Sequence, residues 1–362
     1  MAMSDLSINA NNRRFIALDV FRVFIVTMVL LFHAVIHKFW HLSGDGFFFR
    51  NMITAAVYMY AFFILSGFVL YYRYGGKDKS FSPYAFYAKR LLKLYPSYLV
   101  FTAVVMLYDG SFDWQVMPAE MLCFQGFFKQ IFPKYGNAGT WFISCIAFSY
   151  MLFPVLSRVI SAHAGKVLLF SFAIIVYITV FSVFYRIDEM AVYINPMYRI
   201  WEFTIGGCLA AIFIRRETKT ERKRSAVIHA LGAGAAFTGL FVAVAVLYKN
   251  NFVNHVDFAR HYIFYACVTV PLFAAIIYML AALGDCRVKN PFWLRTSAFL
   301  SAMTFPFFLW QGLAERLTRD YGCIRSLTGF IAVNLLLAVI SHLIFNRLAA
   351  VVGKKMKGDA SS

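Results

Sequence analysis

Three ionisable side chains interrupt one long apolar stretch near the start of the chain, at Asp19, Arg22 and His33. On a helix, Asp19 and Arg22 are three residues apart and can pair. Arg22 and His33 are eleven residues apart, which puts them on one helix face roughly 16 Å from each other, with His37 one turn further along. A guanidinium there can hold an anionic group, and a neutral imidazole can act as a general base. The alternative is that Arg22 reaches the membrane surface and His33 is a hydrogen-bonded core residue.

A second group of charges precedes Pro96 in the segment FYAKRLLKLYPSY. Lys89, Arg90 and Lys93 lie on adjacent turns of the predicted helix, so their positive charges cluster. Such a cluster can bind the phosphates of a nucleotide-type donor. It can equally contact lipid headgroups and fix the topology, and the residues themselves leave both interpretations open.

A third group lies in the segment NPMYRIWEFTIGGCLA, where Arg199 and Glu202 form an i,i+3 pair. Intramembrane charges mark functional sites by default, although a buried structural ion pair is an equally good interpretation. Gly206 and Gly207 follow one turn later, and Gly67 lies in FFILSGFVLYYR. Small residues at these positions allow helices to approach closely.

The elements that position these groups are membrane helices, because the composition excludes other classes of protein. Of the 362 residues, 61% are hydrophobic and only 14% are charged, with a mean hydropathy of +0.67. These values exclude a soluble globular enzyme and a disordered chain. The six cysteines lack metal-type spacing, so no metal site is predicted. Cys123 and Cys323 could form a disulfide, but unpaired thiols are favoured.

The apolar runs predict an all-α polytopic membrane protein with about ten transmembrane helices. The predicted spans are 15–37, 52–73, 87–108, 139–160, 166–186, 196–214, 226–248, 261–283, 297–316 and 324–348. The polar, proline-containing stretch 109–138 is predicted to be an extracytoplasmic loop that dips back into the protein. One membrane domain, 15–348, would then lie between a cytosolic N-terminal segment, 1–14, and a cytosolic tail, 349–362.

The distribution of basic residues predicts the orientation. With both termini in the cytosol, cytosolic segments contain 23 Lys and Arg, and the opposite side contains 10. This asymmetry follows the positive-inside rule and favours an N-in, C-in topology. The net charge of +18 is therefore explained by topology, and no nucleic-acid partner is predicted.

Four segments in this order resemble acyltransferase family 3, the integral membrane acyltransferases. They are R-x10-H in the first span, FF-x-LSGF in the second, KR-x-x-K-x-YP at the third and R-x-x-EF-x-x-G in the sixth. TWFIS at 140–144 resembles the Trp-containing segment of the family. The chain departs from the family pattern in three places: Lys93 replaces an Arg, Ile146 a Glu and Gln311 a His.

The resemblance implies that Arg22 and His33 occupy the essential Arg-His positions of the family, and that Asp19 belongs to the same motif. It implies that Arg90 and Lys93 bind the donor, and that Arg199, Glu202 and Trp141 contribute to substrate binding. Family members O-acylate, most often O-acetylate, bacterial envelope glycans such as exopolysaccharide and O-antigen.

The expected activity is therefore an O-acetyltransferase reaction in a bacterial cytoplasmic membrane, as a multi-pass protein. Acyl-CoA, in the simplest case acetyl-CoA, is the expected co-substrate, with no tightly bound cofactor, and the expected partners are the bilayer and a glycan acceptor. His33 would act as general base or would accept the acyl group transiently. A transporter or flippase of a lipid-linked sugar is the alternative, although no inverted repeat supports it. A non-catalytic scaffold would leave the intramembrane charges unexplained.

Overall fold

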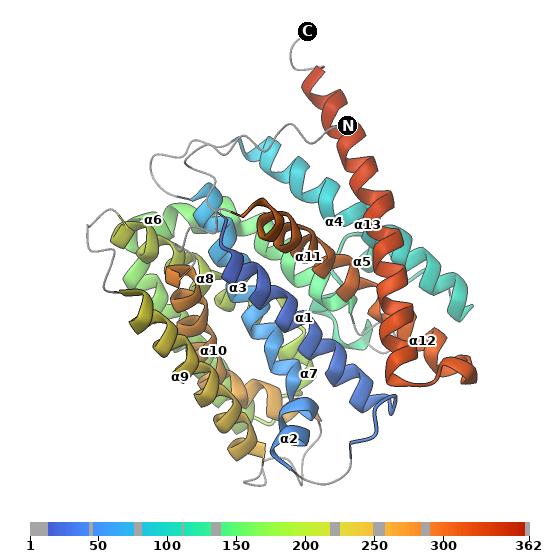
Figure 1. Ribbon diagram of the computed structural model, residues 1–362, viewed down its shortest axis with the longest axis horizontal. Helices are drawn as coiled ribbons and strands as arrows, with labels where there is room; N and C mark the ends of the chain where they lie inside the picture. The colour runs from blue at the N-terminus through green and yellow to red at the C-terminus, as the bar shows by residue number, and fades with distance from the viewer. Residues whose placement is uncertain are drawn as a thin grey trace.

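Helices form all the regular secondary structure of the residues that the computed structural model describes, which are 14–42, 46–75, 82–110, 112–131, 139–217, 225–248, 258–283 and 290–358. The α-helices are α1 Ile16–Ile36, α2 Phe47–Ile53, α3 Tyr58–Tyr74, α4 Pro83–Asp109, α5 Met117–Met121, α6 Thr140–Phe184, α7 Glu189–Tyr193, α8 Pro196–Glu217, α9 Ser225–Leu247, α10 Phe258–Leu283, α11 Pro291–Leu309, α12 Gln311–Asp320 and α13 Leu327–Gly358 (Figure 1). Short 3-10 helices include η1 Ala55–Val57, η2 Gln125–Phe127, η3 Lys129–Ile131 and η5 Gly322–Ile324.

Local sequence signals explain where α4 and α11 begin and where α4 ends. Ser82 accepts a hydrogen bond from the Ala85 amide and Pro83 occupies the first turn of α4. Asn290 and Pro291 play the same parts for α11. Gly110 ends α4 with a φ of +60°, a left-handed conformation that glycine adopts without strain.

Two helices from distant parts of the sequence, α3 and α8, form the centre of the bundle. Their backbones meet at glycines. A Cβ atom on Gly67 would lie 1.9 Å from the Phe203 carbonyl oxygen, and one on Gly206 would lie 1.8 Å from that of Ile64. A larger residue at either position would force the helices apart, so the predicted close approach at these glycines is confirmed.

The remaining helices surround this central pair. α1 packs against α3 and α11, while α9 and α10 pack together along one edge and α4 and α13 along another (Figure 1). α1 begins and α13 ends at the same end of the bundle. The basic residues of α4 and the start of α1 lie toward that end, and α12 lies toward the other.

Eight helices are long and apolar enough to cross a membrane in the described residues. One of them, α6, has 45 residues and contains a non-helical residue, His163, between the two predicted spans 139–160 and 166–186. The chain kinks at His163, and at 1.5 Å per residue each of the two helical arms is about 30–35 Å long, enough to cross the hydrocarbon layer. α11 is not among the eight. The count of ten spans and the N-in, C-in orientation therefore stay predictions.

The last two predicted spans have different bounds in the structure. The span 297–316 divides at Trp310 into α11 and α12. The reason is the polarity of α12, whose charged residues Glu315, Arg316, Arg319 and Asp320 form ion pairs. The span 324–348 continues as α13 to Gly358, so its helix enters the predicted tail 349–362.

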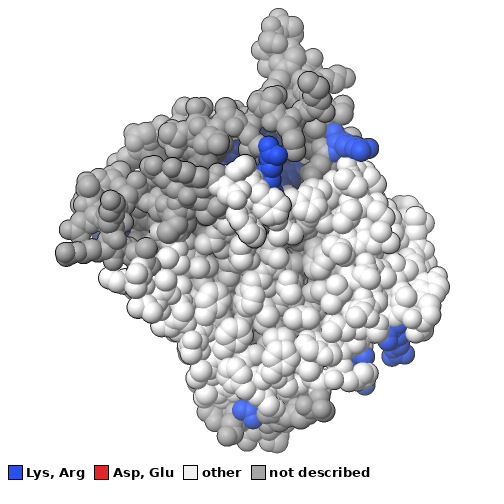
Figure 2. All heavy atoms as spheres, viewed as in Figure 1, with Lys and Arg blue, Asp and Glu red and all other residues white. Residues whose placement is uncertain are grey.

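Large apolar side chains cover much of the outer surface, including Leu107, Leu169 and Phe184, which are each at least 73% exposed. On the face drawn in Figure 2, the visible Lys and Arg side chains of the described residues lie toward the ends of the molecule, and the broad area between is uncharged. An apolar belt with charges at its margins is the surface that a bilayer requires.

The described part of the segment after α4, residues 112–131, packs back onto the bundle, as predicted, whereas residues 132–138 lie outside the described residues. Glu120 and Gln125 are each only 3% exposed. The Tyr98 hydroxyl donates to the Glu120 carboxylate at 2.8 Å, and Gln125 Nε2 donates to the Thr140 carbonyl at 2.8 Å. These bonds tie the segment to α4 and to the start of α6.

The favoured interpretation of the cysteines holds for Cys123 and Cys323, since both are free thiols, one buried and one exposed. Cys286 lies outside the described residues.

Candidate active site

The predicted pairing at the start of α1 is present. Arg22 Nη1 lies 3.8 Å from Asp19 Oδ1 and donates a 2.6 Å hydrogen bond to the Ser301 hydroxyl of α11. Asp19 also accepts a 2.7 Å bond from Arg14 Nε, a stronger contact than the one to Arg22. Asp19 therefore lies between two guanidinium groups, and it orients both.

Arg22 belongs to a larger group of cations at this end of the bundle. Lys93 interacts electrostatically with Arg90, Arg22, Arg73 and Arg14, and Arg22 with Arg90 and Arg14. We call these five residues the basic cluster: Arg14, Arg22, Arg73, Arg90 and Lys93. The Asp19 carboxylate contacts two of its members, Arg14 and Arg22. Such a cluster attracts a polyanion.

Aromatic rings hold one member of the basic cluster in place. The Arg90 guanidinium lies 5.3 Å from the Tyr74 ring centre and 5.4 Å from that of Tyr150, within cation–π range. Arg90 Nε is buried without a hydrogen-bond partner among the described residues, whereas Lys93 is exposed. Arg14 and Arg73 were not singled out by the sequence analysis, because basic residues beside a membrane helix are explained equally well by topology.

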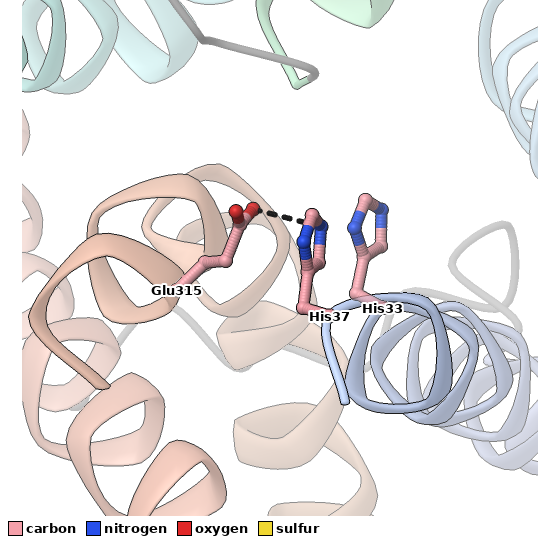
Figure 3. A group of neighbouring side chains, drawn as sticks. All are labelled: His33, His37 and Glu315. Atoms are coloured by element: carbon pink, nitrogen blue, oxygen red, sulfur yellow. Dashed lines mark ion pairs between the residues drawn. The ribbon is translucent and has the colours of Figure 1, made fainter. Parts of the chain in front are cut away.

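His33 and His37 lie at the other end of α1, stacked with their ring centres 5.7 Å apart and their planes 13° from parallel (Figure 3). His37 Nε2 lies 3.1 Å from Glu315 Oε2, which reaches across from α12. His33 Nδ1 is buried and has no hydrogen-bond partner in the described part of the chain. A nitrogen in this state has a lone pair or a proton available for a substrate.

Glu315 is a site residue that the sequence analysis missed. The continuous span 297–316 placed it at a membrane boundary, where a carboxylate needs no explanation. The separation of α12 from α11 turns Glu315 toward α1. Gln311 lies one turn earlier on α12, 5% exposed, and both polar atoms of its amide lack partners among the described residues. The signal available was the i,i+4 spacing of two polar residues in a short, charged segment.

The predicted substrate residues Arg199, Glu202 and Trp141 come together elsewhere, in the core between α3, α6 and α8. Arg199 Nη1 bonds Glu202 Oε1 at 2.7 Å, and both residues have no exposed surface. The Arg199 guanidinium lies 4.2 Å from the Tyr193 ring centre and 5.4 Å from that of Trp141. An aromatic cage of this kind compensates a buried cation, and it leaves no surface of the pair for a ligand to contact.

The site residues thus form three groups: the basic cluster, the histidines of α1 with Glu315, and the buried Arg199–Glu202 pair. α1 carries the basic cluster's Arg22 near one end and His33 toward the other, on one helix face about 16 Å apart. The buried Arg199–Glu202 pair is the third group and lies in the core where α8 packs against α3 and α6.

Comparison with known proteins identifies the family of the chain. The family model described as an acyltransferase domain, that of acyltransferase family 3, matches residues 15–346. Searches among curated proteins and among solved structures found no match to the chain. The match covers α1 through most of α13, including all the site residues except Arg14. The chain therefore belongs to acyltransferase family 3.

Proposed function

We propose that this protein transfers an acyl group, in the simplest case acetyl, from cytosolic acyl-CoA to a hydroxyl of a bacterial envelope glycan. One observation carries the proposal: a single face of α1 joins a strongly basic cluster to an imidazole whose buried Nδ1 has no partner among the described residues. In acyl-CoA, the phosphates need a basic environment and the reacting thioester carbonyl needs a catalytic base. The pantetheine arm separates these two parts of the molecule.

The basic cluster supplies the donor site. The exposed Lys93 and the ring-supported Arg90 meet the nucleotide phosphates, and Arg22 extends the positive surface along α1. Arginine binds phosphate oxygens through two parallel N–H groups, which fixes orientation as well as position. Acyl-CoA is a co-substrate that enters from the cytosol and leaves as CoA, with no resident cofactor in this scheme.

His33 performs the proton transfers. A ring nitrogen takes the proton from the acceptor hydroxyl while the hydroxyl oxygen forms a bond to the thioester carbonyl carbon. The carbon–sulfur bond then breaks, and the protonated imidazole returns the proton to the leaving thiolate. The products are the glycan ester and CoA thiol, with no net change in protons. A transient acyl-histidine gives the same products in two steps.

The burial of Arg199, Glu202 and Trp141, of which only Trp141 has any exposed surface, supports a positioning role for these residues. They fix α8 against α3 and α6, and they act on the substrate site through the placement of these helices. We place the protein in the bacterial cytoplasmic membrane, with the glycan acceptor approaching the α12 end. A lipid-linked sugar flippase is the alternative, and membership of an acyltransferase family argues against it.

Turnover by the purified protein tests this function. With acetyl-CoA and an acceptor glycan, we expect free CoA thiol to appear together with an equal amount of glycan ester, measured by thiol titration and mass spectrometry. A flippase would move the glycan lipid across a vesicle membrane without releasing thiol, and that result would overturn the proposal.

The donor site is tested by replacing Arg90 and Lys93 together with Gln. Each loses a charge-assisted contact worth about 1.5–3 kcal/mol, so we expect acyl-CoA affinity to fall at least about tenfold. Calorimetric titration of the detergent-solubilised protein measures this change. Lys166→Gln is the matched control, because Lys166 is exposed on α6 and predicted to face the same side. Equal acyl-CoA affinities for the double variant and the control would mean that Arg90 and Lys93 fix the topology and do not bind the donor.

A further inference from the structure

We propose that His33, His37 and Glu315 bind a divalent transition-metal ion of the Zn²⁺ type, and that the bound ion stops acyl transfer. One ligand atom from each residue lies within 4.8 Å of the other two. The three side chains come from two helices and converge between α1 and α12 (Figure 3). The inhibition, though not the metal binding, rests on the function proposed above.

The ligand chemistry favours a transition metal. His33 and His37 are four residues apart, the spacing by which two histidines on one helix face hold a single zinc ion. A carboxylate completes a His2Glu set, which leaves a fourth position for water. Imidazole nitrogens select Zn²⁺, Cu²⁺ or Ni²⁺ over Mg²⁺ and Ca²⁺, which prefer oxygen ligands.

The distances are close to those of a bound site. In a tetrahedral site with ligand bonds of about 2.0–2.2 Å, two donor atoms lie about 3.3–3.6 Å apart. The 4.8 Å limit therefore requires a closure of at most about 1.5 Å, which side-chain rotations supply. His37 and Glu315 already lie 3.1 Å apart, and the buried Nδ1 of His33 has no partner to lose among the described residues.

Access and local charge decide how tightly the ion binds. The His37 side chain is 31% exposed and gives a route to the site from the α12 end. Arg319 Nη1 lies 3.7 Å from Glu315 Oε1, so this guanidinium competes with a cation for the carboxylate. Arg316 is adjacent on α12, but Asp109 engages it at 2.8 Å. Arg319 is therefore the main electrostatic obstacle. Its side chain is 53% exposed, and its Nε already donates to Asp320 Oδ1 at 3.1 Å, which gives the guanidinium another carboxylate when a metal takes Glu315.

A bound ion would block catalysis through His33. An imidazole nitrogen that holds a metal has its lone pair occupied, so the ring loses the basicity that the proposed reaction needs. The metal-free protein would be the active form, and zinc would be a reversible inhibitor acting from the α12 side.

Zn²⁺ titration of the purified, chelator-treated protein tests the site directly, by calorimetry. We expect one zinc ion per chain, with His37→Gln and Glu315→Gln each lowering its affinity at least about tenfold. Arg319→Gln should raise the affinity, because it removes the competing cation. His163→Gln is the matched control, since His163 is exposed on α6 outside the group. Affinities that are equal in all four variants would overturn the proposal.

The activity measurement keeps the two parts separate. Zinc should inhibit each protein relative to its own metal-free rate, at lower concentration for Arg319→Gln and at higher concentration for Glu315→Gln. Stoichiometric zinc binding without inhibition would overturn the inhibitory role. Zinc binding by a protein that never turns over acyl-CoA would instead overturn the proposed function and leave the metal site standing.

Discussion

At the scale of single residues, Arg22 illustrates how one side chain serves structure and function together. Its hydrogen bond to Ser301 joins α1 to α11, and its charge adds to the basic cluster. The i,i+3 pairing with Asp19 was predictable from spacing, since both residues lie on one helix. The bond to Ser301 was not, because the two positions are 279 residues apart in sequence.

Replacement of Arg22 by Lys separates these two contributions. Lysine keeps the positive charge but lacks the planar group that binds phosphate through two N–H donors. In steady-state kinetics, we expect kcat/KM for acyl-CoA to fall by about tenfold or more, mainly through KM. Ser301→Ala removes only the interhelix hydrogen bond, so it should leave KM for acyl-CoA nearly unchanged. If Ser301→Ala raises KM as much as Arg22→Lys, Arg22 is a structural residue.

At the scale of elements, the segment between α4 and α6 contains a carboxyl group that is almost fully buried, that of Glu120. Burial raises the pKa of Glu120 to about 7, and the hydrogen bond from Tyr98 opposes this change without cancelling it. A carboxyl whose pKa is higher in the folded than in the unfolded state stabilises the fold only while it is protonated. Its ionisation therefore lowers stability as pH rises from about 4.5 to about 7.

Glu120→Gln should accordingly stabilise the protein in a pH-dependent way. Glutamine keeps the acceptor oxygen for the Tyr98 hydroxyl and never ionises, so it avoids the cost of a buried charge. Thermal unfolding in detergent should give similar melting temperatures for both proteins near pH 5. Above pH 7 the variant should melt several degrees higher. A difference that is the same at both pH values would mean that Glu120 does not titrate in this range.

Elements also show where sequence reasoning stops. Apolar runs predicted α1, α4, α8, α9 and α10 with ends close to those observed, because lipid contact demands a continuous apolar stretch. The division at Trp310 was not predicted. Whether Glu315 belongs to a span or to a separate helix depends on its contacts. His37 is distant in sequence and meets Glu315 only in the folded chain, and Arg319 meets it only when α12 is helical.

At the scale of the whole molecule, the arrangement separates two chemical environments along one helix. The basic cluster lies at the end where α1 begins and α13 ends, and the His37–Glu315 pair lies toward α12. The positive-inside rule assigns the first end to the cytosol. Under the proposed function, the charged donor and the glycan acceptor would approach His33 from opposite sides of the membrane.

The orientation is tested with two cysteines, one in the first turn of α4 and one in the segment that follows its other end. Tyr84 and Trp114 are 75% and 73% exposed, so Tyr84→Cys and Trp114→Cys present accessible thiols. With a membrane-impermeant maleimide on intact cells, we expect Trp114→Cys to react and Tyr84→Cys to react only after lysis. A protein in which the exposed native Cys323 is replaced by Ser provides the background. The opposite labelling pattern would contradict the N-in, C-in topology.

The most direct test of the central claim is the rate of acyl transfer by His33→Gln. Glutamine keeps hydrogen bonding but has no basic nitrogen, so it separates a chemical role from a structural one. In purified, metal-free protein we expect His33→Gln to lose at least about a hundredfold in glycan acylation while keeping its expression level and acyl-CoA affinity. His37→Gln, one turn further along, should retain most of the rate, and the exposed His163→Gln should retain all of it. Near-normal acylation by His33→Gln would contradict the account.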